Sequence, residues 1–181
     1  MNQQLTLQTF QMTSGRIKLI NCDQKILELI LDGNDAIRKA LNIHVPDKWT
    51  EFGDVIFKYS LEKIVADAAS VIWWAYLPIH IESNTLIGSC GYKGPPNTNG
   101  MVEIGYEIVE AYRNQGYATE LAHMLIGNAF NNPQVIKLQA HTLAIENASV
   151  KVLKKCGFVF VEELEDKEDG TILKWILERR D

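Results

Sequence analysis

The chain has 181 residues, of which 46% are hydrophobic and 23% are charged, and its formal net charge at pH 7 is −5. This length is typical of one domain with a substantial core, and the charged fraction is that of a folded protein. An acidic chain lacks the broad positive surface that binds the DNA backbone, so we expect no nucleic-acid partner.

The N-terminus and the cysteines indicate neither export nor membrane insertion. Residues 1–12 are polar and Gln-rich, unlike a signal peptide, and are expected to form a flexible N-terminal segment. The longest apolar run, 71–79, is too short to cross a membrane. Cys22, Cys90 and Cys156 are widely spaced and form no CxxC pair, so buried free thiols are predicted. We therefore expect a cytoplasmic protein with no membrane partner.

In chain order, the hydrophobic pattern changes repeatedly between strand and helix. Helical signals occur in two or three short segments within 23–70 and in two clear ones, 118–130 and 149–156. Seven segments carry the alternation or the short apolar runs of strands: 16–21, 71–79, 85–92, 102–109, 135–142, 158–164 and 171–177. This order predicts one α/β domain, with a mixed sheet and helices on both faces.

The segment between the strand 102–109 and the long helix has the composition of an anion site. A glycine-containing loop leads directly into a helix N-terminus, where unpaired N–H groups and the helix dipole favour a phosphate. Gly116 would let the backbone approach the ligand, Arg113 would add a charged contact, and Thr119 would add a hydroxyl. The alternative is that Gly116 only makes a tight turn and Arg113 is solvated.

Other common chemical motifs do not occur in this sequence. There is no GxxxxGK[ST], no GxGxxG after a strand, no HExxH and no GxSxG. The four histidines are scattered, so no metal site is predicted.

Four segments of this sequence resemble motifs of the GNAT acetyltransferases. Arg113-x-x-Gly116-x-Ala118 matches the [RQ]-x-x-G-x-[GA] loop that binds the acetyl-CoA pyrophosphate in that family. The strand Glu103–Ile108 (EIGYEI) precedes it, and Gly116–Glu120 (GYATE) is typical of the RimJ/RimL-like branch of ribosomal-protein N-terminal acetyltransferases. Asn147–Phe158 resembles the helix of that branch that ends in Gly-Phe.

The resemblance implies a GNAT-like, mostly antiparallel sheet of about seven strands that opens between strands 4 and 5, where the pantetheine arm pairs with exposed backbone. The co-substrate would be acetyl-CoA, with no metal. The residues that would contact it are Ile108, Val109, Arg113, Asn114, Gln115, Gly116, Tyr117, Ala118, Thr119 and Asn147.

The sequence departs from this family pattern at two positions near the second helix. The branch more often has N-x-x-S, whereas this chain has Asn147-x-Ser149, with Glu146 in the expected asparagine position. Many GNAT enzymes also have a tyrosine before Gly-Phe that protonates the leaving thiolate, and here that position is Leu153. The RimJ/RimL-like branch assigns this role to Ser149. The alternative is that Ser149 is a helix N-cap.

Acetyl transfer to an amine requires a base, and the family acts by direct attack without an acyl-enzyme. Glu103 and Glu107 lie on one face of their strand, opposite the apolar residues. The resemblance favours Glu103 as the base, provided that burial raises its pKa. A water relay past two structural carboxylates is the alternative.

The predicted activity is transfer of an acetyl group to a primary amine, either a protein N-terminus or a small molecule. The acceptor site would come from residues 23–70 and the loop 94–100. Two alternatives remain: a transferase for a longer acyl-CoA, and a CoA-binding sensor or scaffold with little activity. The chain would be a monomer or a homodimer.

Overall fold

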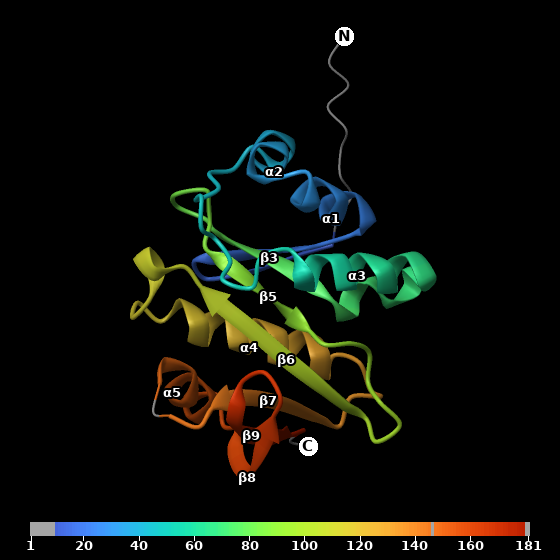
Figure 1. Ribbon diagram of the computed structural model, residues 1–181, viewed down its shortest axis with the longest axis vertical. Helices are drawn as coiled ribbons and strands as arrows, with labels where there is room; N and C mark the ends of the chain where they lie inside the picture. Colours follow the sequence, from blue (N-terminus) through green and yellow to red (C-terminus); the bar gives the residue numbers. More distant parts are fainter. Residues whose placement is uncertain (1–9, 146, 180–181) are drawn as a thin grey trace.

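The computed structural model describes residues 10–145 and 147–179, which form one mixed sheet with helices on both faces (Figure 1). The strands follow the spatial order β1-β2-β3-β5-β6-β7-β9-β8, and β4 pairs with β3. Their bounds are β1 Gln11–Ser14, β2 Ile17–Asn21, β3 Ala75–His80, β4 Thr85–Leu86, β5 Gly88–Tyr92, β6 Met101–Ile108, β7 Lys137–Leu143, β8 Val159–Asp166 and β9 Gly170–Glu178.

The helices divide between the two faces of the sheet. Their bounds are α1 Gln24–Leu31, α2 Asn34–Leu41, α3 Val55–Ala66, α4 Tyr117–Phe130 and α5 Ala148–Lys155, and two short 3-10 helices cover Ala68–Trp73 and Glu110–Tyr112. The first three helices pack with β3 and β4 in one buried cluster, whereas α4 and α5 pack with β6, β7 and β9 in the other. Figure 1 shows α4 passing behind β5 and β6.

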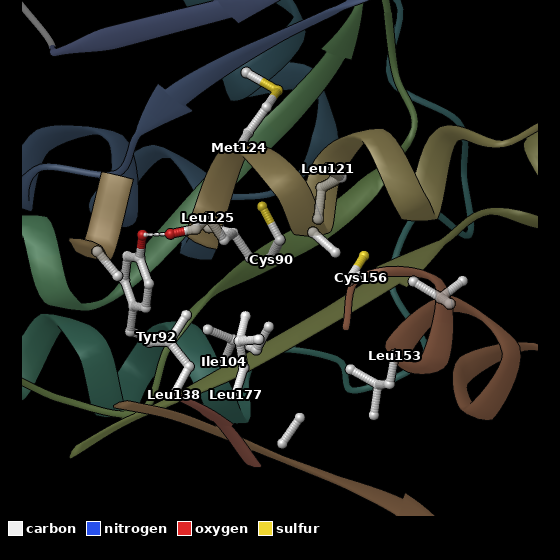
Figure 2. Close-up of a cluster of buried hydrophobic side chains, with 14 of the residues drawn as sticks. Cys90, Tyr92, Ile104, Leu121, Met124, Leu125, Leu138, Leu153, Cys156 and Leu177 are labelled. Carbon is white, nitrogen blue, oxygen red and sulfur yellow. Dashed lines mark hydrogen bonds between the residues drawn. The ribbon is translucent and has the colours of Figure 1, made fainter. Parts of the chain in front are cut away.

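The core on the second face is built from the apolar stripe of α4. Leu121 and Leu125 are fully buried there against Ile104 of β6 and Leu138 of β7 (Figure 2). The hydroxyl of Tyr92 donates to the carbonyl of Leu125 at 2.7 Å. Because this stripe faces the sheet along the whole helix, the N-terminus of α4 is held in a fixed position at the end of β6.

The sheet opens between β6 and β7. The two strands are parallel and pair only from Met101 to Glu103, opposite residues 137–139, whereas β6 stays paired with β5 as far as Ile108. These are the fourth and fifth of the seven predicted strands, so the expected position of the opening agrees with the structure.

The sequence analysis missed two features of the sheet, so the described residues form nine strands where about seven were expected. The polar segment Gln11–Ser14 forms the edge strand β1, so part of the segment expected to be flexible is in fact ordered. The predicted strand 85–92 is divided into β4 and β5, and the start of the predicted strand 71–79 is a 3-10 helix. Edge pairing and strand breaks depend on tertiary contacts that a local pattern does not contain.

Local sequence accounts for two helix ends. Asp23 caps α1 by accepting a hydrogen bond from the Ile26 amide, and Gly157 ends α5 in the left-handed region. The prediction of three buried free cysteines is confirmed. Among the described residues, no helix is long and apolar enough to span a membrane.

Candidate active site

The loop before α4 has the geometry of an anion-binding site. Asn114 and Gly116 have φ angles of 60° and 86°, in the left-handed region, and α4 begins at Tyr117 without a side-chain cap. Within the described residues, the amide groups of 114–119 have no recorded acceptor in the protein. Backbone N–H groups in such a turn form a concave donor site, to which the helix N-terminus adds partial positive charge. This geometry fits an anion such as a phosphate, and residues 113–119 are named the phosphate loop.

The side chain of Arg113 lies at the end of β6, next to this loop. Its Nε donates to the carbonyl of Ile108 at 2.7 Å, and its Nη2 is 2.5 Å from the carboxylate of Glu51. Glu51 belongs to the segment between α2 and α3, and its amide donates to Glu107 at 2.9 Å. In this structure Arg113 therefore joins the phosphate loop to the segment expected to contribute to the acceptor site.

A second guanidinium lies closer to Gly116, and the sequence analysis did not identify it. Arg16, in the turn between β1 and β2, donates to the carbonyl of Gln115 at 3.0 Å and forms an ion pair with Glu120 at 3.0 Å. It also stacks 4.1 Å from the ring centre of Tyr117. Because Arg16 is about a hundred positions away from α4, only the folded chain brings them together.

The two ends of the phosphate loop are anchored to one buried histidine. His80, at the end of β3, contacts the hydroxyl of Tyr117 through Nε2 at 3.0 Å and that of Ser83 through Nδ1 at 2.8 Å. Ser83 in turn contacts the hydroxyl of Tyr112 at 2.9 Å. This network fixes Tyr112 and Tyr117, and therefore holds the loop between them.

The backbone of β6 that faces the opening belongs to its even-numbered residues. Hydrogen bonds from Val109 to Ile87 and from Lys93 to Glu103 direct the odd-numbered residues toward β5. In an antiparallel ladder, alternate residues point to opposite sides. Tyr106 and Ile108 therefore direct their N–H groups into the opening, whereas the Val109 N–H is already bonded. The Val109 N–H is therefore not available to a ligand in this structure, whereas the N–H of Tyr106, which the sequence analysis did not include, is.

Glu103 lies at the last point of pairing between β6 and β7 and is largely buried. It pairs with the ammonium of Lys93, contacts His141 Nδ1 at 3.0 Å and accepts from Gln139 at 2.7 Å. Burial alone would raise the pKa of Glu103, but the hydrogen bonds and charge of these partners hold the pKa below its usual value of 4.5. The raised pKa on which its predicted role as base depended is therefore absent.

Glu107 has a different set of partners. Its carboxylate accepts from the Ser89 hydroxyl at 2.6 Å and from the amide of Glu51. It is four residues from Glu103, which corresponds to about 13 Å along a strand. The two carboxylates therefore act at separate places on the same face of the sheet.

Asn147, and not Ser149, is the N-cap of α5. The side-chain oxygen of Asn147 accepts from the amide of Val150 at 3.0 Å. In the described part of the chain, the Ser149 hydroxyl and the Asn147 amide nitrogen have no recorded partner. The capping alternative for Ser149 is therefore wrong, and both groups are left to contact a ligand. Glu146, the other unusual position here, lies outside the described residues.

Two substitutions of Asn147 separate its capping role from ligand binding. Asn147→Asp keeps the capping oxygen but loses the N–H donor, whereas Asn147→Ala loses both. We expect Ala to lower the free energy of unfolding by about 1 kcal/mol and Asp to change it far less. Both should raise the Kd for CoA by a similar factor, as calorimetry would measure. An Asp variant with unchanged affinity would leave Asn147 a cap only.

Most large aromatic side chains between residues 49 and 74 are in the core and do not line an acceptor site. Trp49, Phe57, Trp73 and Trp74 are buried, whereas Phe52 is 59% exposed next to Glu51. Among the residues described by the structure, no cluster of His, Cys, Asp or Glu could hold a metal ion.

The comparisons with known proteins agree with this geometry. Residues 32–159 match the model of the acetyltransferase (GNAT) domain family. The uncharacterized N-acetyltransferase YjdG of Bacillus subtilis is 26% identical over 148 residues, which cover 81% of this chain and 88% of that protein.

Two solved structures share the fold at low sequence identity. Ribosomal-protein-S5-alanine acetyltransferase from Vibrio fischeri has a TM-score of 0.70 at 14% identity, over 95% of this chain and 98% of that one. RimL, a ribosomal L7/L12 alpha-N-protein acetyltransferase in complex with coenzyme A, has a TM-score of 0.65 at 15% identity, over 91% and 95%. With the anion-binding loop and the opened sheet, the family match shows that this chain belongs to the GNAT family of N-acetyltransferases.

Proposed function

We propose that this protein transfers the acetyl group of acetyl-CoA to a primary amine, and that the loop 113–119 binds the CoA pyrophosphate. The observation that carries the proposal is the row of unpartnered amides of 114–119, at the N-terminus of α4 and beside the opening of the sheet. One bound molecule can therefore place its phosphates on the loop and its thioester in the opening.

The pantetheine arm would pair with the backbone of β6 where β7 is absent. The amides of Tyr106 and Ile108 face this space, and an N–H group at the thioester carbonyl stabilises the charge that develops there. Asn147, through its free amide nitrogen, would donate to a pantetheine carbonyl.

The amine would attack the thioester carbon directly, so that a C–N bond forms as the C–S bond breaks. The amine proton would pass to the Nε2 of His141, whose Nδ1 lies 3.0 Å from the Glu103 carboxylate on the face opposite α4. With the Nδ1 proton donated to Glu103, the Nε2 of His141 is free to accept a proton. The departing thiolate would take a proton from Ser149 or from water.

For the acceptor, a protein N-terminus is the first choice and a small-molecule amine the second. The solved structures that share this fold include ribosomal-protein acetyltransferases, one of them an alpha-N-protein acetyltransferase. The tip of the β8–β9 hairpin adds negative charge on the same side as Glu103. The pKa of its Asp166 is lowered mainly by backbone amides, with smaller effects of Lys93 and His141. Such a surface favours a cationic amine.

The test is thiol release from acetyl-CoA with peptide N-termini, polyamines and aminoglycosides as acceptors. We expect turnover with at least one class, and more with peptides than with polyamines. Tight CoA binding without turnover on any amine would instead favour a sensor or scaffold. Activity only with longer acyl-CoA thioesters would favour a transferase for a longer acyl group.

Replacing Glu51 is expected to strengthen CoA binding. Its carboxylate occupies Arg113 in the free protein, so it competes with a phosphate for that guanidinium. The pair is exposed, and such pairs contribute at most about 1 kcal/mol. Glu51→Gln should therefore lower the Kd for CoA by up to about fivefold, as measured by calorimetry at low salt. A higher Kd would mean that Glu51 orients Arg113 for binding.

A further inference from the structure

We propose that Arg16 is the second cationic residue of the CoA phosphate site and that Glu120 positions it there. This inference rests on the proposed function of the loop 113–119. It assigns a role to the turn between β1 and β2, which lies far from the loop in the sequence and carries no part of the motif.

Arg16 is held at the loop by several independent contacts. Its Nε and Nη2 are each 3.0 Å from the Glu120 carboxylate, and its Nη1 is 3.0 Å from the carbonyl of Gln115. Its backbone amide also donates to Glu120 at 2.7 Å, so the main chain is fixed as well as the side chain. The guanidinium has little freedom left to lose when a ligand binds.

The position of Arg16 is the one that a phosphate on this loop would meet. A Cβ added to Gly116 would lie 3.4 Å from Arg16 Nη2, so the guanidinium covers the side of the loop that glycine leaves open. By holding the carbonyl of Gln115, Arg16 also fixes the peptide whose N–H belongs to Gly116.

Arg16 still has donors to offer. A guanidinium has five N–H groups, and three are engaged here, so two remain. The side chain is 47% exposed, and the free groups are therefore accessible to a ligand. Arg113, in contrast, is bound to Ile108 and Glu51 at the end of β6. The two arginines approach the loop from different directions.

Glu120 is an acidic residue beside an anion site, and its role is to hold Arg16 in place. A carboxylate in the first turn of α4 opposes a phosphate unless its charge is neutralised. Arg16 neutralises it, and Glu120 in return docks the turn, because a Cβ on Gly15 would come within 2.7 Å of its oxygen. Glu120 is thus a positioning residue for Arg16.

The experiment compares acetyl-CoA with S-acetylpantetheine, which carries the same thioester without the pyrophosphate. Arg16→Gln should raise the KM for acetyl-CoA and the Kd for CoA by about tenfold to a hundredfold, with kcat nearly unchanged. The kcat/KM for S-acetylpantetheine should change less than about twofold. A role in folding alone would affect both substrates equally, and that result would overturn the proposal.

Three more variants complete the test. Arg16→Lys keeps the charge but cannot bridge Gln115 and Glu120 together, so its KM should lie between those of the wild type and Arg16→Gln. Glu120→Gln should also raise the KM for acetyl-CoA selectively. Lys25→Gln removes one positive charge from α1, on the other face of the sheet, and should leave both substrates unaffected. If Arg16→Gln fails to fold, an equal effect of Arg16→Lys on both substrates overturns the proposal.

The outcomes separate this inference from the proposed function. A wild-type protein that binds no CoA would overturn both. Wild-type binding together with an unchanged Kd in Arg16→Gln would overturn only the assignment of Arg16.

Discussion

Gly116→Glu should reduce CoA binding at least a hundredfold. Gly116 has a φ of 86°, which a residue with a side chain rarely adopts. The new side chain would be directed at the guanidinium of Arg16, 3.4 Å from its Cβ, and would place a carboxylate in the proposed phosphate site. Strain and charge repulsion therefore act together at one position, and calorimetry with CoA measures the result.

Gly127→Glu is the matched control for this substitution. Gly127 lies near the other end of α4, is exposed and has open space where a Cβ would be added. Gly127→Glu adds the same charge to the same helix, far from the loop. We expect its affinity for CoA to stay within about twofold of the wild type. Unchanged binding by Gly116→Glu would show that the phosphates bind elsewhere.

Glu103→Gln should lower kcat/KM by about 10² to 10⁴, the usual contribution of general acid–base catalysis, because it weakens His141 as the base. The amide can still bond to Gln139 and His141, but it is neutral and cannot stabilise His141 once that ring has taken up the amine proton. Glu107→Gln makes the same chemical change on the same face of β6 and should lower kcat/KM less than Glu103→Gln does. Stopped assays of thiol release measure both variants. A Glu103→Gln variant with more than a third of wild-type activity would favour a water relay.

The pH dependence of Glu103 follows from its lowered pKa. Because the folded-state pKa is below 4.5, this carboxylate stays ionised through the neutral range, and any loss of activity from its protonation occurs below pH 4.5. The same shift means that Glu103 stabilises the folded state above its unfolded pKa. This contribution is lost as the pH falls through the folded value. Glu103→Gln should therefore make unfolding less sensitive to acid, as thermal melts between pH 3 and 6 would show.

The sequence was sufficient to predict an element wherever the residues of that element carry the pattern themselves. The apolar stripe of α4, the Asp23 cap and the loop around Gly116 are local patterns, and the structure has each of them. The polar edge strand β1 carries no such pattern, because its pairing with β2 and not its composition makes it a strand.

The site itself was predictable only in part, since its charges come from distant segments. Arg16 reaches the loop from the turn between β1 and β2, and Glu51 reaches Arg113 from the segment before α3. Likewise, the pKa of Glu103 depends on its burial and on Lys93, which follows β5, and His141 of β7. The sequence motif identifies the residues of the loop. The partners that neutralise and orient those residues come from other segments, and the sheet topology brings them together.

A crystal structure of the protein with CoA tests the central claim most directly. We predict the pyrophosphate within hydrogen-bond distance of the amides of residues 115–119, the guanidinium of Arg16 beside it, and the pantetheine paired with Tyr106 and Ile108. The thiol should then lie in the opening between β6 and β7. Phosphates bound away from the N-terminus of α4, or a closed β6–β7 edge with the cofactor outside it, would contradict the account.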